Sequence, residues 1–137
     1  MTWYGFQHDN LKLVDEFQYG LTEIYRDKIK VSKHIANPGC YATSVLMPLI
    51  ELVKNDLIDA DSIIVDSKSG YSGAGKTNDP QSLMLEVKET IKTYGVGDHK
   101  HIAEINQELS RNINNKVEIF FSANLIPVER GILSNIY

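Results

Sequence analysis

The feature that most constrains the fold is a turn followed by an amphipathic helix. The turn is Asn37-Pro38-Gly39-Cys40, and it ends an extended segment over residues 31–36, because the residue before a proline is driven out of the helical region. Residues 41–55 then predict a helix with one apolar face. The apolar residues of that face recur every three or four positions and are Val45, Leu46, Leu49, Ile50 and Val53. Pro48 lies inside this pattern and predicts a kink or one loosened turn.

The remaining apolar runs predict strands and helices in mixed order. Strands are expected at residues 62–66, 117–121 and 130–137. Helices are expected at residues 21–29, 83–94 and 101–112, and a polar, glycine-rich loop at residues 67–79. Strands and helices do not alternate strictly, as they do in a doubly wound sheet. We therefore expect an α+β fold with a mixed sheet and helices packed on one face.

The composition excludes several classes of function. The 137 residues carry 14 basic and 18 acidic side chains, and this net charge of −4 gives no support for a nucleic-acid partner or an anionic membrane surface. Hydrophobic residues make up 42% and charged residues 23%, which suits one folded domain. No apolar run approaches the roughly 18–20 residues of a membrane helix, and no secretory signal is visible. A single cysteine excludes an intrachain disulfide and fits a reducing cytoplasm.

That cysteine, Cys40, lies where the extended segment meets the predicted helix. The unpaired N–H groups of a helix N-terminus and the positive end of its dipole stabilise a thiolate. Gly39 would let a substrate approach the backbone, and the N–H groups of Gly39 and Cys40 would face a developing oxyanion. These features predict a nucleophile. The alternative is a small side chain that only packs at the start of the helix.

The segment Gly70–Thr77 matches the phosphate-binding pattern of glycine, four residues, then Gly-Lys-Thr. A P-loop runs directly into a helix, whereas Asn78-Asp79-Pro80 predicts a turn. The strand over residues 117–121 continues into Ser122-Ala123-Asn124, without the aspartate that would hold a magnesium ion, and no parallel sheet of alternating strands and helices is predicted. A P-loop nucleotide-binding protein is therefore the less favoured alternative. The loop can still bind an anion through its N–H groups and Lys76.

Two histidines, His99 and His101, lie at the start of a predicted helix, with Glu104 on the same face. The residues alone leave three interpretations open. The pair is solvated, or it ligates a metal with Glu104, or it supplies an acid–base imidazole to Cys40 that a carboxylate holds in place. No further ligand cluster supports a metal, so we predict no metal site.

Six motifs, in one order, cover nearly the whole chain. They are Trp3-Tyr4-Gly5, Tyr19-Gly20-Leu21-Thr22-Glu23, residues 35–43 (Ile-Ala-Asn-Pro-Gly-Cys-Tyr-Ala-Thr), residues 66–76 (Asp-Ser-Lys-Ser-Gly-Tyr-Ser-Gly-Ala-Gly-Lys), residues 99–105 (His-Lys-His-Ile-Ala-Glu-Ile) and residues 127–132 (Pro-Val-Glu-Arg-Gly-Ile). Together they resemble the N-acetyl-gamma-glutamyl-phosphate reductase family, the arginine-pathway member of the semialdehyde dehydrogenase group. The stretch Asn-Pro-Gly-Cys-Tyr-Ala-Thr is specific.

The resemblance implies roles for individual residues. Cys40 would be the nucleophile, and the pair of His99 and His101 would contain the acid–base group. Glu104 would orient the histidines, and Arg130 would be available for an anionic group of the substrate. The other residues implied beside the substrate are Ser69, Gly70 and Ser72. Lys76 stands where relatives often carry arginine. The lysine keeps the positive charge but lacks the two parallel N–H donors with which a guanidinium binds an anion.

The resemblance also implies the architecture of a longer protein. Members of the family open with a dinucleotide-binding domain that carries a Gly-x-Gly-x-x-Gly turn, and this sequence has no such stretch. We therefore expect residues 1–137 to be one catalytic and dimerisation domain, truncated at both ends, with the fold of the C-terminal domain of glyceraldehyde-3-phosphate dehydrogenase. NADP would be bound mainly by the missing domain, and no residue of this chain is assigned to it.

The implied reaction is the NADPH-dependent reductive dephosphorylation of N-acetyl-L-glutamyl 5-phosphate to the semialdehyde, through a thioester on Cys40. The implied partners are that substrate and further copies of the chain, in a cytoplasmic homodimer or homotetramer. This chain alone is expected to be inactive. The rival interpretation is a dimerisation module without catalysis, and a related carrier-linked or aminoadipyl substrate stays open.

Overall fold

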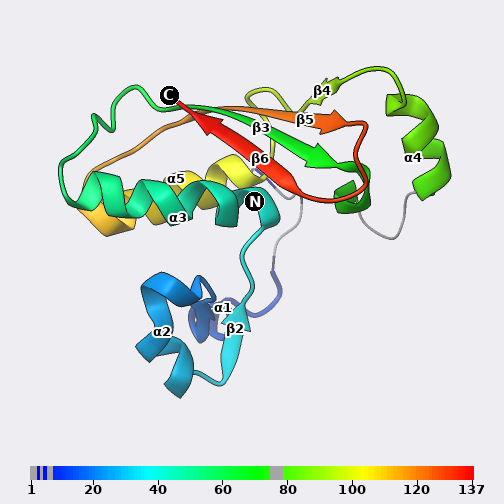
Figure 1. The fold of residues 1–137 in the computed structure, drawn as a ribbon. Coiled ribbons are helices and arrows are strands. Elements are labelled where there is room, and N and C mark those ends of the chain that lie inside the picture. Colours follow the sequence, from blue (N-terminus) through cyan, green and yellow to red (C-terminus); the bar gives the residue numbers. More distant parts are fainter. Residues whose placement is uncertain (1–2, 4, 6–7, 75–78) are drawn as a thin grey trace.

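A four-stranded mixed sheet forms the upper layer of the computed structural model (Figure 1). The structure describes residues 3, 5, 8–74 and 79–137. The strands lie in the order β4 (Lys92–Tyr94), β5 (Phe120–Ile126), β3 (Ile64–Gly70) and β6 (Ile132–Ile136). β3 is parallel to β5 and antiparallel to β6, while β4 is antiparallel to β5. The sheet is therefore mixed, as predicted.

Two long helices lie side by side on one face of this sheet (Figure 1). They are α3 (Cys40–Lys54) and α5 (His101–Ile113). The shorter α4 (Pro80–Val87) lies beyond the end of the sheet, and the 3-10 helix η1 (Tyr71–Ala74) follows β3. The predicted α+β class, with helices on one face of a mixed sheet, is confirmed.

The first part of the chain forms a smaller unit below α3 and α5 in Figure 1. It contains α1 (Leu11–Asp15), β1 (Phe17–Tyr19), α2 (Thr22–Val31) and β2 (His34–Ala36). β1 and β2 pair in parallel, with Tyr19 opposite Ala36. β2 leads directly into the turn before α3, so the end of β1 lies beside the chain that carries this turn.

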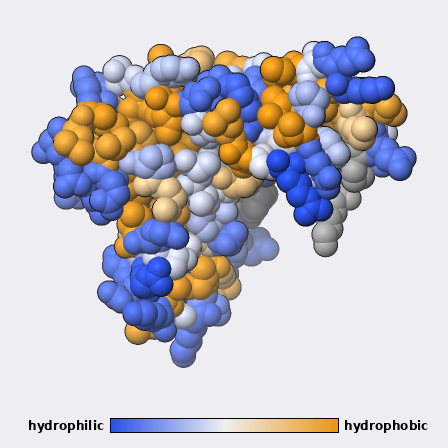
Figure 2. Space-filling view, viewed as in Figure 1, coloured by the Kyte–Doolittle hydropathy of each residue, from blue (hydrophilic) through white to orange (hydrophobic). Residues whose placement is uncertain are grey.

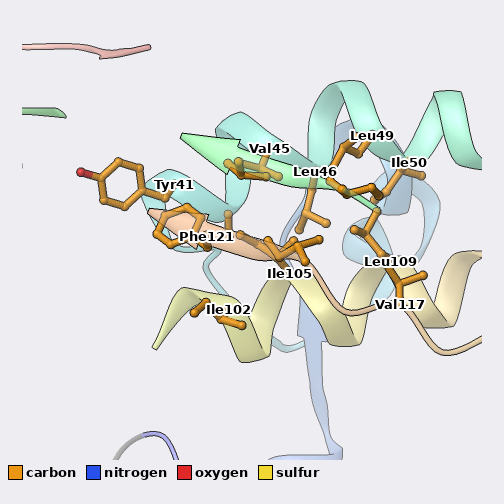
Figure 3. Close-up of a cluster of buried hydrophobic side chains, with 14 of the residues drawn as sticks. Tyr41, Val45, Leu46, Leu49, Ile50, Ile102, Ile105, Leu109, Val117 and Phe121 are labelled. Atoms are coloured by element: carbon orange, nitrogen blue, oxygen red, sulfur yellow. The ribbon is translucent and has the colours of Figure 1, made fainter. Parts of the chain in front are cut away.

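The core fills the space between the sheet and the two helices. Figure 3 shows side chains of α3, α5 and β5 converging there. The apolar face predicted for α3 is buried, and it meets Ile102, Ile105 and Leu109 of α5 and Phe121 of β5. A chain of hydroxyls also crosses this interface, because Ser134 Oγ lies 2.8 Å from Ser44 Oγ and 2.7 Å from Ser67 Oγ. These contacts fix the position of α3 over the sheet.

The carboxylate of Glu108 on α5 is fully buried, with 0% exposure. It accepts hydrogen bonds from Tyr25 Oη of α2 at 2.8 Å and from Arg111 Nη1 at 2.9 Å. Burial and the bond to Glu108 raise the pKa of Tyr25, so the phenol stays protonated and remains a donor. This pair ties α2 to α5.

Several predicted boundaries are wrong. The loop expected from residue 67 begins later, because β3 continues to Gly70 with a ladder on each side. The helix expected over 83–94 ends at Val87, and residues 92–94 instead pair with β5. The strand expected over 117–121 is shifted to Phe120–Ile126. Pro48 is exposed and does not interrupt α3, and α1 and β1 were not predicted at all.

No helix within the described ranges is both long and apolar enough to cross a bilayer.

Truncating a core side chain between the helices is expected to destabilise the fold. Ile105 is 0% exposed, so Ile105→Ala leaves a cavity and should lower the free energy of unfolding by about 2–5 kcal/mol. Val31, at 83% exposure, provides the control, and Val31→Ala should change that free energy by less than about 0.5 kcal/mol. Urea denaturation followed by circular dichroism measures both. Equal losses in the two variants would contradict the core described here.

Candidate active site

Cys40 is the first residue of α3, and its side chain is exposed and free. Gly39 caps the helix without a side-chain hydrogen bond, and the first helical bond runs from Thr43 N to Gly39 O at 2.8 Å. The N–H groups of the first turn thus keep the capacity to hold an anion, and the helix dipole favours negative charge there. The structure places the sulfur at the N-terminus of a helix, where a ligand has access to it.

A cavity of about 380 Å³ opens beside Cys40. This volume suits a small-molecule site. Its walls include Tyr41, Ser69, Gly73, Lys92 and Tyr94, which come from α3, β3, η1 and β4. Lys92 forms an ion pair with Glu86, which also lines the cavity, so the walls carry one cation and one anion. Of the predicted site residues, this cavity brings Cys40 and Ser69 together.

Tyr41 connects this cavity to the histidines. Its hydroxyl lies 3.0 Å from that of Tyr94, and its ring packs edge-on against His99 at 5.6 Å and His101 at 5.8 Å between centroids. Burial and the neighbouring Tyr94 raise the pKa of Tyr41, so its phenol stays protonated. The buried, neutral tyrosine therefore contacts both imidazoles and also lines the cavity beside Cys40.

The ring of His101 packs directly on Gly39. A Cβ atom at position 39 would lie only 2.4 Å from His101 Nε2, so the close approach requires glycine at this position. His101 is 8% exposed, and its Nδ1 is buried without a hydrogen-bond partner among the described residues. The ring of His99 lies 4.7 Å from that of His101, and His99 Nδ1 accepts the backbone N–H of His101 at 3.2 Å. The predicted histidine pair is thus adjacent to the turn that carries Cys40.

Both imidazoles are held in the neutral form. Burial lowers the pKa of His99 to about 4, helped by the charges of His101 and Lys100. Burial also lowers the pKa of His101, although the carboxylate of Glu104 opposes this effect. A neutral imidazole can accept a proton, which is what an acid–base role for either ring requires.

Glu104 does not hydrogen-bond either histidine ring. Its Oε1 accepts the backbone N–H of Gly39 at 2.8 Å and the hydroxyl of Tyr19 at 2.6 Å. Glu104 therefore anchors the turn before Cys40, while its charge acts on His101 through space. Sequence reasoning expected it to orient the histidines and did not single out Tyr19.

The remaining predicted substrate residues do not line the Cys40 cavity. Gly70 is buried, and a Cβ there would lie 2.7 Å from Glu129 O, so this glycine serves close packing of the backbone. Ser72 is exposed and donates its backbone N–H to Glu129 O at 3.0 Å. Arg130 is exposed, with its Nε 3.1 Å from Glu129 Oε1. Neither Ser72 nor Arg130 lines the cavity.

Part of the glycine-rich loop lies outside the described residues. Lys76 and Thr77 belong to residues 75–78, so anion binding by this loop stays a prediction. Within the described part of the chain, no three histidine, cysteine, aspartate or glutamate side chains lie together as a potential metal site.

The described residues do not fit a dinucleotide. A pyrophosphate cradle consists of a glycine-rich turn between a parallel strand and a helix. β1 is followed by α2 through Gly20-Leu21 only, and a Cβ at Gly20 would lie 2.8 Å from Ile35 Cγ2, so this glycine packs against β2 instead of facing open space. β3 leads into η1, not into a long helix. The described residues thus offer no such cradle.

Three wall residues of the cavity were missed from the sequence. Tyr94 and Lys92 were placed in a helix, so their position beside Cys40 could not be seen. Tyr41 was read only as part of α3. The available signal was the run Ile91-Lys92-Thr93-Tyr94, whose β-branched and aromatic residues before a glycine are typical of a short strand.

Comparisons with known proteins identify the family. Residues 40–137 match the family model for the semialdehyde dehydrogenase dimerisation domain. An N-acetyl-gamma-glutamyl-phosphate reductase of Rhodospirillum rubrum is 50% identical over 136 residues, which are 99% of this chain and 39% of that protein. One of Afipia carboxidovorans is 46% identical over 135 residues, or 98% of this chain and 38% of that protein. The chain thus spans about two fifths of the length of these curated relatives.

Solved structures support the fold alone. The crystal structure of aspartate semialdehyde dehydrogenase II from Vibrio cholerae superposes with a TM-score of 0.62 at 14% sequence identity, covering 89% of this chain and 44% of that one. The match with the family model, which covers most of the chain, decides its membership. The chain belongs to the semialdehyde dehydrogenase family, and it is similar to the N-acetyl-gamma-glutamyl-phosphate reductases, which confirms the resemblance of its motifs.

Proposed function

We propose that this chain is the catalytic and dimerisation part of an NADPH-dependent reductase that converts N-acetyl-L-glutamyl 5-phosphate to N-acetyl-L-glutamate 5-semialdehyde, in arginine biosynthesis in the cytoplasm. The observation that carries this proposal is the exposed Cys40 at the N-terminus of α3, beside a cavity of about 380 Å³ and next to the Gly39–His101 contact. The likeness to reductases of that name supports the substrate.

The first half of the reaction follows from the position of Cys40. Its thiolate attacks the γ-carbonyl carbon of the acyl phosphate and forms a C–S bond. The carbonyl oxygen becomes an oxyanion, which the N–H groups at the start of α3 stabilise. As the carbonyl re-forms, the C–O bond to phosphate breaks, and phosphate leaves with the electron pair. A thioester on Cys40 remains.

The histidines supply the proton transfers. A neutral imidazole can take the thiol proton from Cys40 and return a proton later, when the aldehyde is released. His101 lies against Gly39, and His99 packs on His101, so one ring is adjacent to the turn and the other supports it. The hydride that reduces the thioester comes from NADPH, which the described residues do not hold.

The cavity offers contacts for an anionic substrate. Ser69 is a hydroxyl in the wall, and Lys92 is a cation whose partner Glu86 lies at the same wall. Ser72, Gly70 and Arg130 stay predictions as substrate contacts. A related carrier-linked or aminoadipyl acyl phosphate stays an alternative substrate, since no described wall residue is assigned to bind the acetyl group.

The uncovered face of the sheet favours a second role, which is self-association. Ile64 and Phe120 are directly opposite each other on β3 and β5, and Leu133 on β6 is opposite Lys68 on the same face. These three side chains are 48%, 56% and 57% exposed, and no described helix or strand covers them. Figure 2 shows hydrophobic surface along the top of the molecule, where this face begins. The match to a dimerisation domain supports a second copy of the chain as the occupant of this face.

Replacing the thiol is expected to abolish turnover. In the full-length enzyme, Cys40→Ser should lower kcat more than about 1,000-fold, because a serine hydroxyl is not ionised at neutral pH and makes a poor nucleophile. Thr43→Ser, one turn further along α3 and exposed, is the control and should retain the turnover of the unmodified enzyme. Circular dichroism verifies that both variants fold. Measurable turnover of the Cys40→Ser variant near that of the unmodified enzyme would contradict the thioester mechanism.

The low pKa of His99 predicts a pH dependence of stability. Histidines of the unfolded chain protonate near pH 6.5, whereas folded His99 protonates near pH 4. Between these values the unfolded state binds more protons, so the free energy of unfolding should fall as the pH drops from about 6.5 to about 4. Above pH 6.5 this contribution is fully present. NMR titration of the imidazole signals measures the pKa directly, and His99→Gln should show a weaker loss over the same window; a His99 midpoint near 6.5 would contradict the buried site.

A charge on the uncovered sheet face is expected to weaken self-association. Phe120→Glu should raise the dimer Kd at least about tenfold, because an aromatic side chain that the proposed interface would bury is replaced by a charged one. The control is Val31→Glu on α2, which is 83% exposed and lies outside the matched family segment. Sedimentation equilibrium measures both. A dimer that tolerates Phe120→Glu, or a chain that stays monomeric at millimolar concentration, would rule out this face as the interface.

A further inference from the structure

One carboxylate oxygen joins three separate parts of the chain beside Cys40. Glu104 Oε1 accepts the hydroxyl of Tyr19 at 2.6 Å and the backbone N–H of Gly39 at 2.8 Å. Tyr19 ends β1, Gly39 begins the turn into α3, and Glu104 belongs to the first turn of α5. Hydrogen bonds from neutral donors to an ionised carboxylate are short and about twice as strong as those between neutral groups.

This junction replaces the usual helix cap. Gly39 has no side chain to cap α3, so the turn cannot hold itself in place through its own residues. It is instead held on α5 at two points, which are the Glu104 carboxylate at its N–H and the His101 ring against its Cα. Glu104 and His101 are three residues apart and therefore lie on one face of the helix. Together they hold Gly39 against α5.

The hydroxyl of Tyr19 holds the Glu104 carboxylate in its position at Gly39. A glutamate side chain has several rotatable bonds and loses entropy when it is held in one position. Tyr19 is held beside the turn by the β1–β2 ladder, in which it is paired with Ala36, and Gly20 N donates to Ala36 O at 2.9 Å. Burial and the bond to Glu104 raise the pKa of Tyr19, so its phenol remains a donor at any physiological pH. The Tyr19 hydroxyl thus stays protonated, and the β1–β2 ladder fixes its position.

We propose that Tyr19 is a positioning residue for Cys40, which acts through Glu104 by holding the Gly39 turn against His101. This inference rests on the proposed function, in which Cys40 is the nucleophile. Tyr19 does not line the Cys40 cavity, so it is not a catalytic residue. Its effect is on the start of α3, whose N–H groups stabilise the thiolate and the oxyanion.

The chain contains a matched pair of tyrosines for the test. Tyr25 donates to Glu108, one turn further along α5, at 2.8 Å, in the same way as Tyr19 donates to Glu104. The Tyr25–Glu108 pair does not touch the Gly39 turn. Tyr19→Phe and Tyr25→Phe each remove a hydrogen bond from a tyrosine hydroxyl to a carboxylate of α5, and Tyr25→Phe also removes the bond that Tyr25 Oη accepts from Asn112 Nδ2 at 3.0 Å. Only the Tyr19–Glu104 bond reaches the turn before Cys40.

Alkylation of Cys40 by iodoacetamide reports the effect, because this chain has one cysteine and its side chain is exposed. Access does not limit the rate, so the rate over pH 6–9 follows the stabilisation of the thiolate. Tyr19→Phe should lower the alkylation rate at pH 7 about three- to tenfold, as expected for the loss of one hydrogen bond. It should also shift the pH profile of the rate toward higher pH. Tyr25→Phe should leave the rate within about twofold, although both variants lose stability.

A double-mutant cycle tests whether the effect passes through Glu104. In a Glu104→Ala background, the further change Tyr19→Phe should leave the alkylation rate unchanged, because the carboxylate that transmits it is gone. Equal alkylation rates in Tyr19→Phe and Tyr25→Phe, or full additivity with Glu104→Ala, would overturn the proposal.

Turnover of the full-length enzyme separates this proposal from the proposed function. If Tyr19 positions Cys40, Tyr19→Phe lowers kcat and leaves KM nearly unchanged, since the cavity walls are intact. If Cys40→Ser is inactive but Tyr19→Phe behaves like Tyr25→Phe, the positioning role fails and the proposed function stands. If Cys40→Ser retains turnover while Tyr19→Phe alone slows alkylation, the proposed function fails and the structural linkage stands.

Discussion

Burial of one face of α3 is the constraint on which the site depends. The buried side chains of α3 pack against α5 and against the inner face of the sheet, and the hydroxyls of Ser44, Ser134 and Ser67 hold the helix over β3 and β6. Because a helix is stiff, fixing its body also fixes its first residue. The position of Cys40 is therefore set by packing that lies up to several turns away from the thiol.

The second organising element is one face of α5. Its residues His101, Glu104 and Glu108 follow each other at spacings of three and four, so they share a face. Two of them are carboxylates that accept hydrogen bonds from the hydroxyls of Tyr19 and Tyr25, in the N-terminal unit. The rings of these two tyrosines pack edge-on, with 6.3 Å between their centroids. The third is the imidazole that touches Gly39. One helix face thus carries the imidazole of His101 and contacts both the N-terminal unit and the turn before α3.

Much of this arrangement could be predicted where a local pattern determines it. The apolar spacing of α3 and the proline–glycine turn predicted the helix and its start correctly, and the family motifs indicated the residues around Cys40. Tyr94 was misplaced because the apolar residues Leu83, Val87 and Ile91 have a helical spacing, while pairing with β5 decides the structure of residues 92–94. Tyr19 was missed because its partner Glu104 is 85 residues away, and no local pattern reports such a contact.

The central position of β3 has a consequence for how the chain folds. Both of its ladders join it to strands that come much later in the sequence, since Val65 pairs with Phe121 on one side and with Ile136 on the other. During synthesis, β3 therefore leaves the ribosome with two open edges, which close only after β5 and β6 have emerged. Contacts of such long range slow folding and prolong the exposure of unpaired strands. The helix that carries the thiol is made before the sheet on which it packs, so Cys40 and its cavity reach their final arrangement only after β5 and β6 are in place.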